Sequence, residues 1–170
     1  MLSLLARFRV TLGFLVGILC FALARPTWMT IGIGACVAIP GESLRLWAAG
    51  HIEKGREITR SGPYRFVRHP LYMGSSIMAI GFAVAAGRVA VVIVVAAYMG
   101  LTLLAATRTE ERALDEKFKG EYSAYREGRA KPVERQFSWQ RVVLNREYRA
   151  ASGLVIGLVV LAVIKLMLRP

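Results

Sequence analysis

Five apolar stretches alternate with polar segments along the chain, and each has roughly the length of a helix that crosses a membrane. They cover residues 8–24, 27–50, 71–86, 89–106 and 150–168. A transmembrane helix needs about 20 mainly apolar residues, so the third and fourth stretches lie at the lower limit. The pattern predicts an all-α, polytopic integral membrane protein with about five transmembrane helices, built as a single domain over residues 1–170.

The first apolar stretch has two interpretations. Ala22-Leu23-Ala24 follows the apolar run, and small residues at this spacing suit signal peptidase, so a cleaved signal sequence would show the same pattern. We expect a first span that is retained. Cleavage would leave the orientation of the later spans unchanged.

The second apolar stretch contains two charged residues. Glu42 and Arg45 follow Pro40-Gly41 near its end. Charged residues inside a span face the protein interior, because lipid solvates them poorly. Being three residues apart, the two side chains could pair on one helix face or could belong to a pocket, and the pattern leaves both possibilities open.

Composition and charge support a membrane protein and orient it. The chain is 55% hydrophobic with a mean hydropathy of +0.46, above the apolar share of about 45–50% in soluble domains. Eighteen of the 23 Lys and Arg residues lie in the N-terminus, in residues 51–69 and in residues 107–149. The positive-inside rule therefore places these segments in the cytoplasm. Because the basic residues alternate with apolar stretches, we expect anionic membrane lipids as partners and no nucleic acid.

The two cysteines carry no predicted chemistry. Cys20 and Cys36 both lie inside apolar runs, without the spacing of metal ligands. We interpret them as small apolar residues, with no disulfide and no metal site.

The polar segment before the third apolar stretch contains GPYRFVRHPLYMG, residues 62–74. Pro70 suits the first position of a helix, since its missing N–H is harmless there. Arg68, His69 and Tyr72 would then converge near one helix N-terminus, which favours an anionic group such as a carboxylate.

The same segment also permits a structural interpretation. Arg65 and Arg68 could anchor a loop to anionic head groups, and Tyr64 and Tyr72 could belong to the aromatic belt of a membrane interface. Residue types alone favour this interpretation.

A second polar segment follows the fourth apolar stretch. Its apolar and aromatic residues are spaced by three or four, which predicts one helical stripe: Glu111, Leu114, Phe118, Tyr122 and Tyr125. An amphipathic interfacial helix with leading acids would have this pattern too. Glu110 and Glu111, however, directly follow the span, at the membrane level where residues 64–72 must lie.

These two segments together resemble the signature of the isoprenylcysteine carboxyl methyltransferase family and of related membrane phospholipid methyltransferases. The resemblance covers about residues 47–125. It implies S-adenosyl-L-methionine as cofactor, bound without a Rossmann domain in a pocket that cytoplasmic amphipathic helices and loops form above the spans. The matching positions imply these cofactor-binding residues: Tyr64, Arg68, His69, Tyr72, Glu110 and Glu111. Arg68, His69 and Tyr72 are also the implied catalytic residues.

Two features adjust this expectation. Family members usually have Gly directly after the Phe of the second segment, whereas Lys119 intervenes here before Gly120, and residues 126–134 match loosely. Because this later stretch shapes the acceptor side of the site in the family, the departure concerns the identity of the methyl acceptor and leaves the expectation of cofactor binding unchanged. The segment FSWQRVVLNREYRA, residues 137–150, resembles the ends of many bacterial relatives and implies a bacterial inner membrane.

The sequence therefore predicts methyl transfer to a lipid-borne or apolar small-molecule acceptor at the cytoplasmic membrane face. A carboxylate acceptor needs no base, whereas an amine or thiol acceptor would use His69. The alternatives are an NADPH-dependent membrane reductase of the sterol-reductase type and a non-catalytic membrane protein. The chain lacks a Gly-rich phosphate-binding turn, which weighs against a dinucleotide.

Overall fold

The computed structural model describes residues 2–118, 120–131 and 133–168, with side chains described from Thr11 onward. Within these residues the chain is all-helical and contains no strand. Its elements are α1 (Leu2–Leu23), α2 (Trp28–Ala49), the short 3-10 helix η1 (Gly62–Arg65), α3 (Pro70–Ala85), α4 (Val89–Phe118), α5 (Glu121–Arg126), α6 (Trp139–Leu144) and α7 (Tyr148–Met167).

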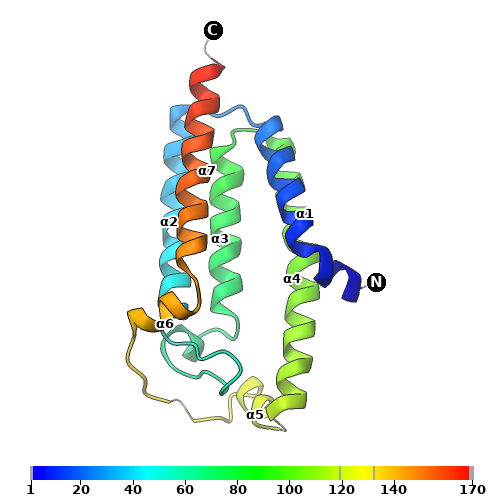
Figure 1. Cartoon of the computed structure of the whole chain (residues 1–170), viewed down its shortest axis with the longest axis vertical. Helices are drawn as coiled ribbons and strands as arrows, with labels where there is room; N and C mark the ends of the chain where they lie inside the picture. Colours follow the sequence, from blue (N-terminus) through cyan, green and yellow to red (C-terminus); the bar gives the residue numbers. More distant parts are fainter. Residues whose placement is uncertain (1, 119, 132, 169–170) are drawn as a thin grey trace.

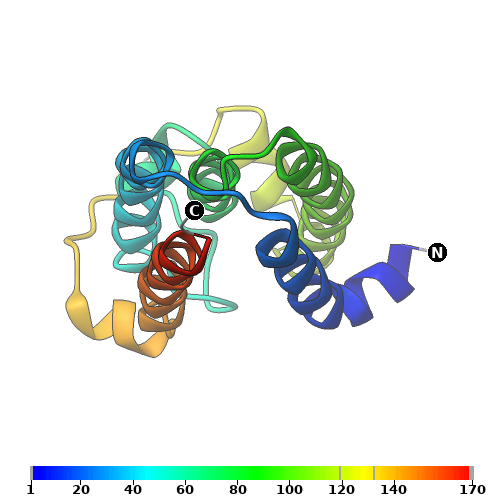
Figure 2. The same ribbon diagram turned by 90° about the horizontal axis from the view of Figure 1, so that it is seen from above.

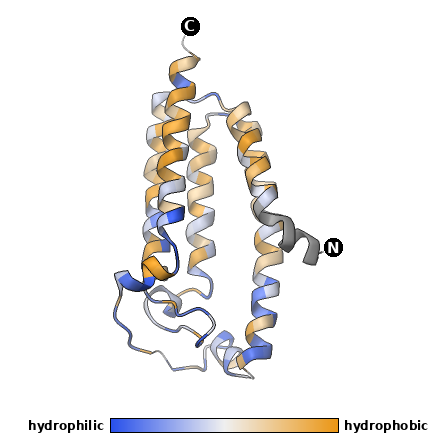
Figure 3. Cartoon of the chain, in the orientation of Figure 1, coloured by the Kyte–Doolittle hydropathy of each residue, from blue (hydrophilic) through white to orange (hydrophobic). Residues whose placement is uncertain are grey.

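The long helices form two groups (Figures 1 and 2). Helices α2, α3 and α7 run side by side, and α1 pairs with α4 across from them. The short helices α5 and α6 gather with the long loops at one end, where the polar residues concentrate (Figure 3). This division into an apolar body and a polar end positions the candidate site.

Each of the five predicted apolar stretches lies in a helix, and three of them, in α2, α3 and α7, have boundaries close to the predicted ones, whereas α1 begins earlier, at Leu2. By length and hydropathy, α4 and α7 are able to cross a membrane, and Thr11–Leu23 and Pro70–Ala85 are shorter apolar helices. Large apolar side chains on the outside of the bundle remain exposed, as lipid-facing residues would be. The start of α3 at Pro70, with His69 as its N-cap residue, is as predicted.

The fourth apolar stretch, residues 89–106, is the first part of a longer helix. Helix α4 continues through the polar residues to Phe118, because residues 107–118 are mostly good helix formers and contain neither Gly nor Pro. The extension carries Glu110 and Glu111 out of the apolar body on a rigid helix.

The single stripe predicted through residues 111–125 is wrong. Gly120 has a φ of 88°, a left-handed conformation that interrupts the helix, so Tyr122 and Tyr125 lie on the separate helix α5. Lys119 itself lies outside the described residues.

Helices α2 and α3 approach each other at the level of their backbones. A Cβ atom on Gly81 would lie 2.6 Å from the carbonyl oxygen of Gly34, and one on Gly74 would lie 2.6 Å from the carbonyl oxygen of Gly41. Small residues at such contacts let membrane helices pack closely. Gly74 is therefore part of the α2–α3 contact and leaves no gap for an acceptor chain at this position.

The opposite end of the bundle is closed by the helix connections. The backbone N–H of Arg25 donates to the carbonyl oxygen of Ala86 at 2.8 Å. Next to it lies a small apolar core formed by Ala24, Ala85, Ala86, Val91 and Leu161. These contacts join the α1–α2 connection to the α3–α4 hairpin.

We expect Gly81→Leu to lower the free energy of unfolding by about 2 kcal/mol, because a side chain there meets the α2 backbone. Gly100→Leu on α4 is the matched control, since a Cβ at Gly100 has no neighbour within 4 Å. Denaturation of both variants in detergent, followed by circular dichroism, measures the difference. Equal stability of the two variants would show that the close α2–α3 contact is unimportant.

Candidate active site

The motif loop, residues 61–69, is the second half of the connection between α2 and α3. Gly62 has a φ of 55°, and a Cβ on it would lie 2.4 Å from the His51 ring. Both observations require glycine at this position. The loop therefore packs directly on the residues that follow α2, and it buries Pro63 and Tyr64 of η1.

His69 lies at the centre of the site. Its Nε2 atom is 3.2 Å from Oε1 of Glu111, and its ring centroid is 5.6 Å from that of Tyr72. Arg68 approaches the same carboxylate, with Nη1 3.7 Å from Oε1. The Glu111 carboxylate therefore connects the extension of α4 to the motif loop.

The Glu111 carboxyl remains ionised in this setting. Burial raises its pKa, but the hydrogen bond with His69 and the nearby positive charge of Arg68 outweigh burial, so the net pKa is lowered. An ionised carboxylate only accepts hydrogen bonds, so it favours an N–H at Nε2 of His69. Nδ1 is then the nitrogen of His69 that can accept a proton.

Tyrosines from two elements meet beside His69. The Tyr125 hydroxyl on α5 donates to the backbone carbonyl of Tyr64 at 2.7 Å. Burial, followed by the charge of Glu110, raises the pKa of Tyr64, so its phenol stays protonated. The Tyr64 hydroxyl is buried and has no hydrogen-bond partner among the described residues.

Two adjoining cavities meet at the motif loop. The smaller, of about 250 Å³, lies under residues 52–59 and reaches Leu114 and Tyr125. The larger, of about 660 Å³, extends along α3 past Tyr72 and Ser75 to the start of α7. Both are lined by six shared residues: Ile52, Lys54, Tyr64, Arg68, His69 and Glu110.

A buried ion pair supports the wall of the larger cavity. Arg45 of α2 donates from Nε to Oε1 of Glu147 at 2.6 Å and lies 3.8 Å from Oε2 of Glu42. The Arg45 guanidinium also donates to the hydroxyl of Ser75 on α3. Arg45 therefore joins α2, α3 and the residue before α7, and it belongs both to an ion pair and to the cavity lining.

The loop over the smaller cavity is held by the segment 133–147. Arg135 pairs with Glu57 at 2.7 Å and with Glu53 at 3.6 Å. Arg141 donates to the backbone carbonyl of Gly50 at 2.7 Å. Lys117 at the end of α4 donates to the carbonyl of Gly55 at 2.6 Å. These contacts hold residues 50–57, several of which line the cavity.

Five of the six predicted cofactor-binding residues line one or both of the two cavities. Tyr64, Arg68, His69 and Glu110 line both, and Tyr72 lines the larger one. Glu111 lines neither cavity and faces His69 instead. The two adjacent glutamates therefore differ in place: Glu110 lines the cavities, and Glu111 contacts His69.

Sequence reasoning missed the residues contributed by the last third of the chain. Glu147, Asn145, Arg146 and Arg149 all line the larger cavity. A usable signal was the arginine within an apolar span, because Arg45 favours acidic partners there and Glu42 need not be the sole one. Glu147, at the start of the last apolar stretch, was available for that pairing.

Comparison with known proteins gives a family and one relative. A sequence profile described as phospholipid methyltransferase matches residues 12–121, which include both motif segments. The chain is 33% identical over 127 residues to the cobalt-zinc-cadmium resistance protein CzcN of Cupriavidus metallidurans, covering 69% of this chain and 57% of that protein. The chain thus spans a little over half the length of this relative.

No solved structure matches the chain. The profile match covers α2, α3 and α4 and carries the motif loop together with Glu110 and Glu111. The resemblance inferred from the motifs is therefore confirmed. The chain belongs to the phospholipid methyltransferase family, within the wider group of isoprenylcysteine carboxyl methyltransferase-like proteins.

Proposed function

We propose that this protein is an integral membrane methyltransferase that uses S-adenosyl-L-methionine and methylates a lipid-borne or apolar acceptor. The observation that carries the proposal is the pair of adjoining cavities. One is covered by polar loops and the other runs along membrane-type helices, and His69, Arg68 and Glu110 lie where they meet. A water-soluble cofactor and a membrane-dissolved acceptor need such a meeting point.

The smaller cavity fits the cofactor chemically. Arg68 supplies a guanidinium for a carboxylate, and Glu110, which has no ion pair among the described residues, supplies an acceptor for an ammonium or a ribose diol. The buried hydroxyls of Tyr64 and Thr59 have no protein partner in the described part of the chain. Polar atoms left unsatisfied by the protein are expected where a ligand completes the hydrogen bonds.

The remaining lining suits the flat and cationic parts of the cofactor. Ile52, Ile58 and Leu114 provide apolar surface for an adenine. The rings of Tyr64 and Tyr72 provide electron-rich faces for a sulfonium. The larger cavity, of about 660 Å³, lies in the range of small-molecule sites, and the adjoining one, of about 250 Å³, lies just below it.

When bound, S-adenosyl-L-methionine supplies a methyl group activated by its sulfonium. The protein then mainly needs to align the reactants and exclude water. Arg68 and Glu110 hold the cofactor, and Tyr72 borders the acceptor space. Glu111 orients His69, whose Nδ1 accepts the proton when the acceptor is an amine or thiol; a carboxylate acceptor requires no proton transfer.

The proposed placement in the membrane follows the charge pattern. The five long helices cross the bilayer, and the polar end with the two cavities faces the cytoplasm, where the cofactor is available. The resemblance of residues 137–150 to bacterial relatives supports the bacterial inner membrane. The acceptor reaches the larger cavity sideways from the bilayer.

Titration with S-adenosylhomocysteine and with NADPH tests the proposal against its alternatives. We expect the purified protein in detergent to bind S-adenosylhomocysteine in a saturable manner by isothermal titration calorimetry and to show no saturable binding of NADPH. Binding of NADPH alone would support the membrane reductase. Binding of neither ligand by folded protein would support a non-catalytic protein.

Glu110 and Glu111 are predicted to contribute to cofactor affinity by different routes, Glu110 directly and Glu111 through His69. Glu110→Gln, His69→Ala and Glu111→Gln should each weaken S-adenosylhomocysteine binding by about tenfold, or roughly 1.4 kcal/mol, as for charged hydrogen bonds in a sheltered site. Because Glu111 acts through His69, Glu111→Gln should have little further effect in the His69→Ala background, whereas Glu110→Gln should add its full effect.

Glu116→Gln, an exposed position on the same helix, serves as the control and should bind as wild type does. Additive losses for Glu111→Gln and His69→Ala would contradict the positioning role of Glu111. Wild-type affinity in all folded variants would move the cofactor site elsewhere.

A further inference from the structure

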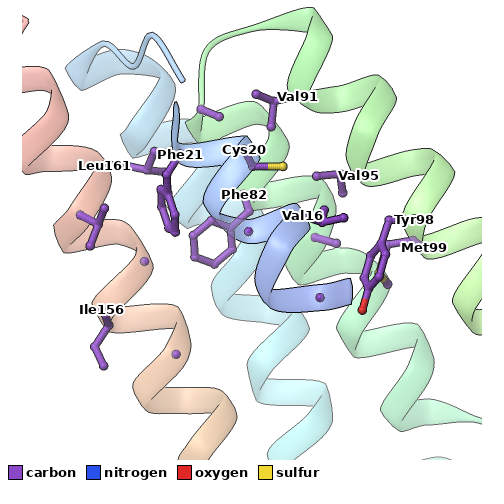
Figure 4. A pocket seen from close by; sticks show the side chains of 17 residues that line it. Val16, Cys20, Phe21, Phe82, Val91, Val95, Tyr98, Met99, Ile156 and Leu161 are labelled. Atoms are coloured by element: carbon purple, nitrogen blue, oxygen red, sulfur yellow. The ribbon is translucent and has the colours of Figure 1, made fainter. Parts of the chain in front are cut away.

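Two further cavities lie outside the candidate active site. One, of about 360 Å³, lies in the apolar body between α1, α3, α4 and α7, where Phe21 and Phe82 belong to its lining (Figure 4). That lining is almost entirely apolar, so it contains no group that would distinguish one hydrocarbon ligand from another. The other cavity has charged and polar walls, which give it chemical selectivity.

The polar cavity, of about 530 Å³, lies between the motif loop and residues 133–136, beside the end of α2. Its volume is in the range of small-molecule sites. It shares no described lining residue with either cavity of the candidate active site. We call it the His51 cavity, and its lining consists of Trp47, His51, Ser61, Gly62, Arg65, Val133, Glu134, Arg135 and Gln136.

Two buried side chains of the His51 cavity lack hydrogen-bond partners among the described residues. They are His51, at its Nδ1 atom, and Ser61, at its hydroxyl, although the two residues are only 6% and 2% exposed. Buried polar groups are ordinarily hydrogen-bonded, so this pair indicates a polar ligand. An imidazole N–H and a hydroxyl can both donate to the oxygens of an anion.

The charges that act on the His51 ring are positive. Burial, followed by the charges of Arg141, Arg135 and Arg65, lowers the pKa of His51. The ring therefore stays neutral, with one N–H to donate. The surrounding guanidinium groups favour a ligand of negative charge.

Arg65 is the cation of the His51 cavity that is available to such a ligand. Arg135 is held by Glu57, with Nη1 2.7 Å from Oε1 and Nη2 2.8 Å from Oε2. The ion pair of Arg65 is with Glu134, at 3.8 Å, and the Glu134 side chain is 95% exposed. A long ion pair to an exposed carboxylate contributes little, so an anionic ligand can displace it.

A row of aromatic rings leads from the His51 cavity to the outer surface. The ring of His51 lies 6.4 Å from that of Trp47 and 6.2 Å from that of Phe137, which in turn lies 5.0 Å from Trp139. Both tryptophans are exposed, and tryptophan is enriched where a membrane meets water. Trp139 begins α6, which lies beside the end of α2, where the apolar body gives way to the polar end (Figures 1 and 3). With α2 across the bilayer, as proposed, the His51 cavity lies at the depth of lipid head groups.

We propose that the His51 cavity binds the phosphate of a membrane phospholipid that is a resident ligand and not the methyl acceptor. Arg65, His51 and Ser61 donate to the phosphate oxygens, and the acyl chains pass the aromatic row into the bilayer. Guanidinium groups match phosphate in geometry and charge, and basic pockets at the cytoplasmic membrane face bind lipid head groups. Because the cavity is separate from the candidate active site, the proposal rests on the placement in the membrane and not on methyl transfer.

Native mass spectrometry of the full-length protein in detergent measures this binding. The probes are dioleoyl phosphatidylglycerol, dioleoylglycerol, which has the same chains without phosphate, and glycerol 3-phosphate, which has no chains. We expect phosphatidylglycerol to bind at least about tenfold more tightly than either of the other probes.

Two substitutions change the charge of the His51 cavity in opposite directions. Arg65→Gln removes the available cation and should lower the affinity for phosphatidylglycerol about tenfold, without changing that for dioleoylglycerol. Glu134→Gln removes the competing carboxylate and should raise the affinity about two- to threefold. Arg56→Gln and Glu116→Gln, at exposed positions that line none of the described cavities, are the matched controls and should have no effect. Circular dichroism verifies that each variant is folded.

Wild-type affinity of the folded Arg65→Gln variant for phosphatidylglycerol would overturn the head-group site. A loss of affinity in Glu134→Gln would contradict it as well, because the effect would then follow loop packing and not charge. Equally tight binding of dioleoylglycerol would refute a role for the phosphate. Equally tight binding of glycerol 3-phosphate would make free phosphate the ligand and would refute the lipid.

Discussion

The backbone contact between α2 and α3 is the constraint on which the site depends. Gly34 and Gly41 on one helix face Gly81 and Gly74 on the other, so each helix leaves room only for hydrogen where they meet. Because the helices are this close, Arg45 of α2 reaches the Ser75 hydroxyl and the Leu71 carbonyl of α3. The polar chain that joins them, residues 50–69, must then fold above the contact as a compact loop, and this loop presents Arg68 and His69.

The second requirement is a rigid connection from the other helix group to that loop. Helix α4 supplies it by extending beyond the apolar body, which brings Glu111 to His69 and Lys117 to the Gly55 carbonyl. Arg135 and Arg141 bind the same loop from a third direction. Two segments distant in sequence, the end of α4 and residues 135–141, thus hold one loop, and this explains how a helical bundle can form a polar cavity at its edge.

Hydropathy predicted the long helices because the apolar length of a helix is a local property, and Pro70 marked the start of α3 for an equally local reason. Hydropathy places only the apolar part of α4, residues 89–106, because the continuation to Phe118 is polar, although nothing there breaks a helix. The break at Gly120 was missed because a regular spacing of aromatic residues suggests continuity. The Arg45–Glu147 pair joins residues 102 positions apart, and only the packing of α2 against α7 reveals it.

Inverted membrane vesicles from cells that produce the protein allow the most direct test of a membrane methyltransferase with a lipid-borne acceptor. The vesicles are incubated with S-adenosylmethionine that carries a tritiated methyl group and then extracted with organic solvent. The account predicts saturable labelling of the organic phase, which is absent from vesicles containing the His69→Ala, Glu110→Gln double variant at equal abundance. Labelling that equals the double-variant background, or that is confined to water-soluble products, would contradict it.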